Sequence, residues 1–308
     1  AWRMKWSQDT YHQYINRKKG RSMKKLLLLV VLLMLAGATS CKGNQTETLI
    51  DRVDSAIDHF IANYATRYLT ESATGLTLEY HVVAGVKVLE NSGYDISLED
   101  YLTSDKVELD LENRQIKQGT EAFIALVIAR AFGLESPNAK QFLTELTTFD
   151  PWNMSYVLMA LNFTSSNVSL KQAIMSDILN VEGKDADYAG AALMALFDHE
   201  IDKTPLVNLI KENLTPQGVL SWGTANACTT AYAIMGLVAS NINPTSAEFT
   251  VENINLVEAL LNFHLGDGSF KYSAEGETDL DYSTPQSFAA LVAYREFVRT
   301  KTQFILFQ

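Results

Sequence analysis

An alanine-rich helical pattern recurs six times along this 308-residue chain, and this repetition constrains the fold more than any other feature. Each copy combines small residues with an apolar pair near its end and a Gly or Asn turn after it, as in residues 81–93 and 120–133. Aligned copies lie 32 to 54 residues apart, which leaves room for one more helix in each interval. Such repeats are typical of helical solenoids and rings. The aligned residues are Val88, Ile128, Ala160, Ala195, Gly236 and Ala290.

Amphipathic segments with a charged face fill the intervals, and we expect them to form outer helices around the alanine-rich inner ones. Six helices of each kind predict an all-α domain over residues 49–308, an (α/α)6 toroid; an open superhelix of unrelated helical hairpins is the alternative. Only residues 107–111 alternate as a strand does, and they predict at most one short hairpin edge. The outer segments are residues 49–69, a weak one near 97–103, 139–147, 169–181, 204–214 and 250–265.

Residues 23–40 have the form of an export signal. A short basic stretch precedes the apolar run 26–35, and small residues follow it. The run is shorter than the roughly 20 apolar residues that a membrane span needs. Residues 38–41 (ATSC) resemble a bacterial lipobox, which predicts a lipid on Cys41. The alternative is cleavage after Ala38 and simple secretion.

The lipobox interpretation makes residues 41–48 a polar tether and places the domain outside the cytoplasm, anchored to the cell membrane of a bacterium. We expect residues 1–22 to be upstream reading frame included by a wrong start. Residues 1–42 hold nine of the 25 Lys and Arg but one of the 36 Asp and Glu, so residues 43–308 carry a net charge of −19. So acidic a body repels phosphate backbones, which argues against a nucleic-acid partner.

Two junctions before alanine-rich helices have a recognisable form. Residues 215–224 (TPQGVLSWGT) and 266–273 (GDGSFKYS) each lead through a short polar loop into such a helix. This pattern resembles the repeat of the prenyltransferase, squalene–hopene cyclase and transcobalamin-like toroids, most fully over residues 215–298 and more weakly over 120–214. The resemblance implies an α/α toroid whose ligand lies at the mouth of the inner barrel.

The catalytic groups of the related enzymes are not matched. Protein prenyltransferases hold zinc with Asp-x-Cys and a His; the corresponding positions here are Asn226, Cys228 and Ser283. The Asp-x-Asp-Asp acid of terpene cyclases does not occur in the sequence. We therefore expect no zinc and no catalysis, and interpret Cys228 as a small buried side chain.

Aromatic residues gather near the starts of the alanine-rich helices, where free N–H groups and partial positive charge are expected. They predict a ligand site at the mouth, although packing between repeats would explain many of them as well. Three acids of the 267–281 loop form a weak calcium candidate. The candidate ligand residues are His81, Trp152, Tyr156, Tyr188, Trp222, Phe270, Tyr272 and Tyr282; the calcium candidates are Asp267, Asp279 and Asp281.

These features predict a non-catalytic, lipid-anchored protein that binds a small ligand or a surface protein at the toroid mouth. The transcobalamin-like resemblance implies a corrinoid as one candidate ligand, with another hydrophobic or aromatic compound as the alternative. A divergent enzyme acting on an isoprenoid or a polysaccharide is the second hypothesis, and a cell-surface scaffold is the third.

Overall fold

The computed structural model describes residues 47–73, 75–164 and 166–307, and those from Thr48 onward form one compact unit. The expected signal peptide, the lipid site Cys41 and residues 1–22 lie outside the described residues. Helices dominate the described part, which confirms the prediction of a mainly helical fold.

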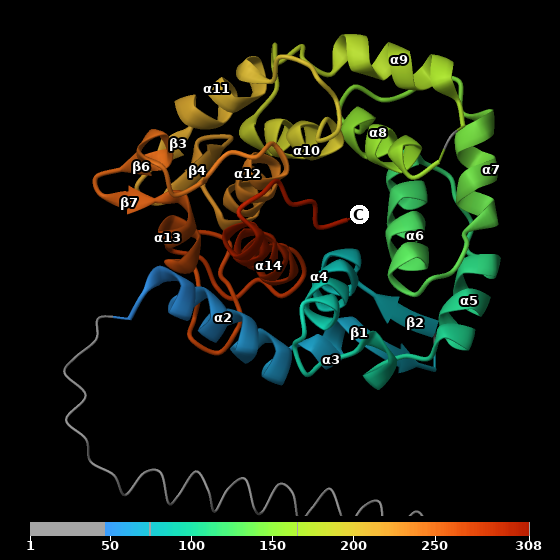
Figure 1. The fold of residues 1–308 in the computed structure, drawn as a ribbon, viewed down its shortest axis with the longest axis horizontal. Coiled ribbons are helices and arrows are strands. Elements are labelled where there is room, and N and C mark those ends of the chain that lie inside the picture. Colours follow the sequence, from blue (N-terminus) through green and yellow to red (C-terminus); the bar gives the residue numbers. More distant parts are fainter. Residues whose placement is uncertain (1–46, 74, 165, 308) are drawn as a thin grey trace, which may run out of the picture. The chain divides into compact units, whose positions relative to one another are not determined.

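Six helices of the described residues form an inner circle (Figure 1). Each packs against the next one along the chain, and the last packs back against the first. All six arise from the alanine-rich segments. They are α4 (Tyr80–Asn91), α6 (Gly119–Ala131), α8 (Met154–Asn162), α10 (Ala186–Ala195), α12 (Ala227–Ala239) and α14 (Ser283–Thr300).

Small residues let the inner helices approach closely. A Cβ atom on Gly190 of α10 would lie 2.5 Å from the backbone oxygen of Tyr232, and one on Gly236 of α12 would lie 2.5 Å from that of Gly190. Both distances are too short for a side chain, so glycine is required at this crossing.

A second layer of helices surrounds the inner circle (Figure 1). It differs from the prediction at residues 97–103, which contain only the short 3₁₀ helix η1 (Leu98–Asp100), with the outer helix following at α5. The expected strand at 107–111 is wrong because Val107 and Leu111, four residues apart, share the buried face of α5 while Leu109 is exposed. The outer helices are α2 (Leu49–Asn63), α3 (Ala65–Tyr68), α5 (Ser104–Asn113), α7 (Pro137–Glu145), α9 (Val168–Asp177), α11 (Thr204–Glu212) and α13 (Leu256–Leu261).

Short antiparallel strands join several helices, and they shorten three of the expected outer segments: 49–69, 204–214 and 250–265. Residues 250–265 begin with a hairpin before α13, and the last residue of 49–69 already belongs to a strand. The strands pair as β1 (Leu69–Ser72) with β2 (Gly75–Leu78), β4 (Gly218–Ser221) with both β3 (Leu214–Thr215) and β5 (Thr224–Ala225), and β6 (Thr250–Val251) with β7 (Ile254–Asn255).

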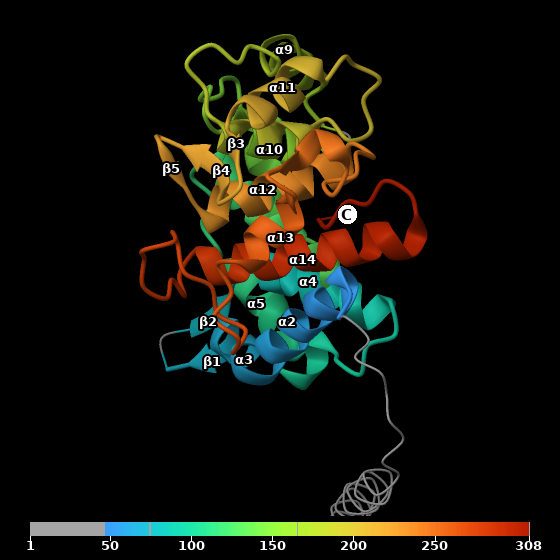
Figure 2. The ribbon, with the colours of Figure 1, turned by 90° about the vertical axis from the view of Figure 1, so that its left-hand side faces the viewer.

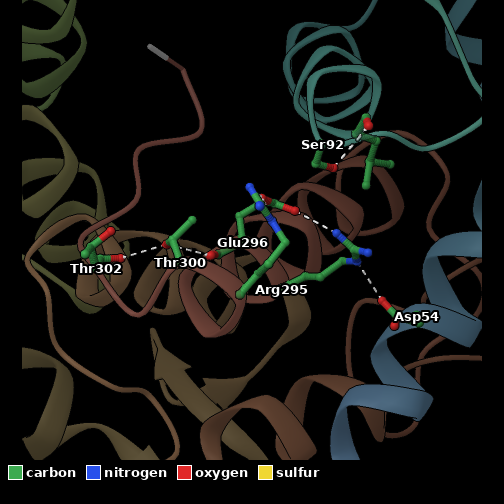
Figure 3. Close-up of polar contacts among 8 residues, drawn as sticks. Asp54, Ser92, Arg295, Glu296, Thr300 and Thr302 are labelled. Atoms are coloured by element: carbon green, nitrogen blue, oxygen red, sulfur yellow. Dashed lines mark hydrogen bonds and ion pairs between the residues drawn. The ribbon is translucent and has the colours of Figure 1, made fainter.

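Charged groups of α14 line the seam where the inner circle closes (Figure 3). Arg295 donates from Nε to Asp54 of α2 at 2.8 Å and from Nη1 to Glu296 at 2.7 Å, and its guanidinium lies over the ring of Tyr94. Glu296 is 1% exposed and also accepts from Arg299 at 2.7 Å. Two arginines therefore compensate this buried carboxylate.

The two ends of the inner circle are covered differently. Figure 2 shows strands β4 and β5 on one side of the helices and residues 301–307 on the opposite side. The latter segment enters the circle at the C-terminal ends of the helices: the Phe304 N–H donates to the Val238 oxygen at 3.3 Å, and Leu306 and Phe307 are buried. We call the other end, at the N-termini of the inner helices, the mouth.

Candidate functional site

The mouth contains a cavity of about 470 Å³ formed by the first turns of α8, α10, α12 and α14 and by the loops before them. Most of the aromatic residues predicted from the sequence line it. The residues of this mouth cavity are Trp152, Tyr156, Asp185, Asp187, Tyr188, Ala191, Trp222, Cys228, Tyr232, Tyr272, Asp279, Tyr282 and Gln286.

Exposed aromatic side chains are concentrated at this cavity. Among the described residues, the Trp, Tyr and Phe side chains classed as exposed are Trp152, Trp222, Tyr272 and Tyr282, and all four belong to the wall of the mouth cavity. Exposed aromatic surface costs free energy unless it is covered by a ligand or a partner. Packing between repeats explains the buried aromatic residues of the fold, but it does not explain these four.

Trp222 is held in an unfavourable backbone conformation. It has a φ of 50° and Gly223 a φ of 84°, in the two-residue turn between β4 and β5, where Ser221 pairs with Thr224. Such turns favour Asn-Gly, because a bulky residue in the left-handed region is strained. With 82% of the side chain exposed, core packing does not compensate this strain. Strain of this kind is a common property of functional positions.

Trp222 faces a second tryptophan across the cavity rim. Its ring lies 6.4 Å from that of Trp152, with 37° between the planes. The Lys184 ammonium lies 3.9 Å from the centre of the Trp152 ring and 4.9 Å from that of Tyr188, and it donates to the Pro151 oxygen at 3.0 Å. One edge of the cavity is thus built from aromatic faces, two of which already accept a cation.

Two of the cavity carboxylates cap helices. Asp185 accepts from the Tyr188 N–H at 3.1 Å at the start of α10 and from the Ser221 hydroxyl at 2.8 Å. Asp279 accepts from the backbone N–H and the hydroxyl of Ser283 at 3.0 and 2.7 Å at the start of α14. The N–H groups expected to be free at the mouth are therefore partly taken by side chains of this chain.

Asp187 has a different environment. It lies in the first turn of α10, where Asp185 is the cap, and it lines the cavity. Burial raises the pKa of the Asp187 carboxyl to about 6; the neighbouring Asp185 carboxylate adds to this shift, and the hydroxyls of Thr229 and Ser221 oppose it. A carboxyl that changes charge near neutral pH in a cavity is a candidate functional group.

A network of hydroxyl groups forms the floor of the cavity. The Tyr232 oxygen lies 2.9 Å from that of Tyr156, which donates to it, 3.0 Å from that of Tyr80 and 3.2 Å from His81 Nε2. His81 Nδ1 lies 2.8 Å from the Glu79 carboxylate, so a neutral ring carries its proton there and accepts the Tyr232 proton at Nε2. Burial raises the pKa of Tyr232 well above its ordinary value, so this hydroxyl keeps its proton.

The positions corresponding to the prenyltransferase zinc ligands come together without the donors that zinc requires. Cys228 Sγ lies 3.4 Å from Ser283 Oγ, whereas Asn226 Oδ1 accepts from the Thr229 N–H at 2.8 Å and caps α12. Cys228 is partly buried and contributes to the cavity wall. Burial raises the pKa of its thiol to about 12, which makes it a poor nucleophile.

Two of the predicted ligand residues lie elsewhere. Phe270 is buried beside the His264 ring, because its loop passes close to α2: a Cβ atom on Gly268 would lie 2.3 Å from the Phe60 nitrogen. His81 is buried behind the cavity floor and reaches the wall only through Tyr232.

The three calcium candidates have separate partners. Asp267 accepts from the Tyr64 hydroxyl at 2.7 Å, Asp279 caps α14, and Asp281 pairs with Arg67 at 3.5 Å. Within the described part of the chain, no group of three or more His, Cys, Asp or Glu side chains is placed to hold a metal ion.

The residues of the cavity wall that were not among the predicted site residues are Asp185, Asp187, Ala191, Cys228, Tyr232 and Gln286. A signal for the first two was present, because two acids at the start of an otherwise apolar helix mark a cap and a first-turn carboxylate.

No family model, curated protein or solved structure matches this chain. Among the described helices, none combines the length and the apolar character needed to cross a membrane. The geometry of the mouth cavity is therefore the basis on which a function can be assigned.

Proposed function

We propose that this chain is an extracytoplasmic bacterial lipoprotein whose closed circle of paired helices is an α/α toroid, and that it binds a small organic ligand in the mouth cavity without catalysis. One observation carries the proposal: the four exposed Trp and Tyr side chains of the described residues all line this cavity. A volume of about 470 Å³ falls within the roughly 300–1,000 Å³ of typical small-molecule sites.

The volume of the cavity also limits the size of the ligand. A corrinoid macrocycle would extend well beyond a space of this size, so we favour a smaller compound, with one planar or cyclic group beside Trp152 and Trp222. The strained turn at Trp222 supports a direct role for this ring, since asparagine would fit the left-handed turn with less strain but would not provide an aromatic face.

Native mass spectrometry of the protein purified from its bacterial host tests both parts of the proposal. We expect a diacylglyceryl group on Cys41 and a retained small molecule. The variant Cys41→Ser should lose the lipid and keep the molecule, whereas Trp222→Ala should keep the lipid and bind the molecule about tenfold more weakly, as expected for one lost ring contact. An unmodified chain that retains nothing would contradict the proposal.

A second candidate function is hydrolysis or elimination on a polysaccharide, and Asp187 is the observation that favours it. A carboxyl with a pKa of about 6 can donate a proton near neutral pH, and Asp185 and Asp279 line the same cavity as possible bases. Incubation with a panel of polysaccharides tests this function. Products formed by the natural chain and lost in Asp187→Asn would replace the binding proposal with an enzyme.

A further inference from the structure

The wall of the mouth cavity has a one-sided charge balance. It contains the carboxyl groups of Asp185, Asp187 and Asp279, and the described residues of the wall include no Lys, Arg or His. Such a cavity attracts cations and repels phosphates and carboxylates. The charge of the wall therefore favours a cationic ligand over an anionic one.

The helix N-termini do not reverse this balance. Their partial positive charge would favour an anion, but Asp185, Asn226 and Asp279 place acceptor atoms on the first turns of α10, α12 and α14. Two of these three caps carry a full negative charge.

The uncharged polar groups of the wall also offer acceptors. Tyr156 donates its hydroxyl proton to Tyr232, so toward any other group its oxygen can only accept, and the Tyr80 hydroxyl is already one such group. The buried Oε1 of Gln286 has no hydrogen-bond donor in the structure. A ligand that brings N–H groups would satisfy such a wall better than one that brings only oxygen acceptors.

The aromatic faces supply the remaining part of a cation site. Lys184 places its ammonium over the rings of Trp152 and Tyr188, so the chain itself shows that a cation is stable against two side chains of the cavity wall. Trp222 adds a third electron-rich face beside them.

From these observations we propose, on the basis of the proposed binding function, that the ligand is an organic ammonium ion whose charged nitrogen contacts the Asp187 carboxylate and whose apolar body lies against Trp152 and Trp222. Asp187 is the natural contact for the nitrogen, because the other two wall carboxylates are held in helix caps.

Three probes of equal size and different charge test this inference: phenethylammonium, 2-phenylethanol and phenylacetate. Tryptophan fluorescence is the readout, because Trp152 and Trp222 both line the cavity; Trp2→Phe and Trp6→Phe remove the other two tryptophans from any chain that keeps residues 1–22. We expect phenethylammonium to bind at least about tenfold more tightly than the alcohol, as a charge-assisted hydrogen bond implies, and phenylacetate to bind most weakly.

Variants of three charged residues test whether the Asp187 carboxylate binds the ammonium group. Asp187→Asn should reduce the preference for phenethylammonium over the alcohol by about tenfold, while Asp58→Asn, which removes an exposed carboxylate from α2, should leave it unchanged. Lys184→Met removes the competing cation, so it should strengthen phenethylammonium binding.

Equal binding of the alcohol and the ammonium probe, no response to the ammonium probe at millimolar concentration, or an unchanged preference in Asp187→Asn would overturn the inference. The failure of the inference can be told from that of the proposed function by native mass spectrometry. A retained anionic or neutral molecule overturns the ammonium ligand but supports binding at the mouth, whereas a chain that retains nothing contradicts both.

Discussion

The two ends of the inner circle are built from the same six helices of the described structure, but they differ in what covers them. From the C-terminal ends, residues 301–307 reach into the circle, and the Phe307 ring is buried 5.3 to 5.7 Å from the rings of Tyr80, His81 and Phe123, which lie near the N-termini of α4 and α6. At the mouth, aromatic rings stay exposed around a cavity with acidic groups in its wall. The C-terminal segment thus covers aromatic rings inside the circle, whereas the aromatic rings of the mouth cavity stay uncovered.

This difference between the two ends separates residues that stabilise the fold from residues that do not. A residue that stabilises the fold is buried and has packing partners, as Phe307 does. Asp187 and Trp222 have the opposite properties: a partly buried carboxyl with a raised pKa, and an exposed ring on a strained backbone. Substitutions at the two ends should therefore change stability in opposite directions.

The largest effect is expected at the covered end. Phe307→Ala should lower the free energy of unfolding by about 3–4 kcal/mol, because it removes a buried aromatic ring and leaves a cavity among three others. Urea denaturation measures the loss. Val298→Ala, at a largely exposed position of α14, is the control and should stay within about 0.5 kcal/mol of the natural chain. A loss below about 1 kcal/mol for Phe307→Ala would mean that the segment does not close this end.

A stabilising effect is expected for Asp187→Asn at the mouth. The pKa of Asp187 is raised from 3.8 to about 6 on folding, so the carboxyl is neutral in both states only well below pH 4. Between about pH 4 and 6 the unfolded chain ionises this group while the folded chain keeps it protonated, so the folded state loses stability over this interval and no more above it. The variant avoids this loss. It should be more stable at pH 8 by up to about 3 kcal/mol, and the two chains should converge near pH 3, below both pKa values.

Urea denaturation at both pH values checks the expectation for Asp187. The groups that face this carboxyl are Asp185 on α10, Cys228 on α12, and Tyr272 and Asp279 before α14, and all of them are kept in the variant. Asp58→Asn should show no comparable gain at pH 8. Destabilisation of Asp187→Asn at pH 8 would make Asp187 a structural residue.

The smallest effect is expected at Trp222. Trp222→Asn should stabilise the chain by about 1 kcal/mol, since asparagine tolerates the left-handed conformation that this turn requires. Thermal unfolding measures the gain. Trp222→Ala removes the ring but keeps the strain, so it should give no gain; equal stabilities of the two variants would show that the turn is not strained at this residue.

The inner helices could be predicted from the sequence, but the chemical properties of the cavity could not. Alanine-rich segments revealed the inner helices because close packing demands small residues, as at Gly190 and Gly236. Helix α5 was misplaced because its outer face carries Leu109, which made residues 107–111 alternate like a strand. The sequence marks Asp187 as a first-turn carboxylate but does not reveal its raised pKa, which depends on burial by groups from other helices and loops that meet only in the folded chain.

The order in which the chain is made gives the closing seam a further consequence. Arg295 of α14 bonds Asp54 across 241 positions of sequence, and α14 packs against both α2 and α4. While the chain is being synthesised, the faces of α2 and α4 that pack against α14 stay uncovered until α14 has been made. Contacts of such long range form slowly, so the alanine-rich faces stay exposed to association during synthesis. We therefore expect this chain to bind chaperones while it is being synthesised and to refold slowly in vitro.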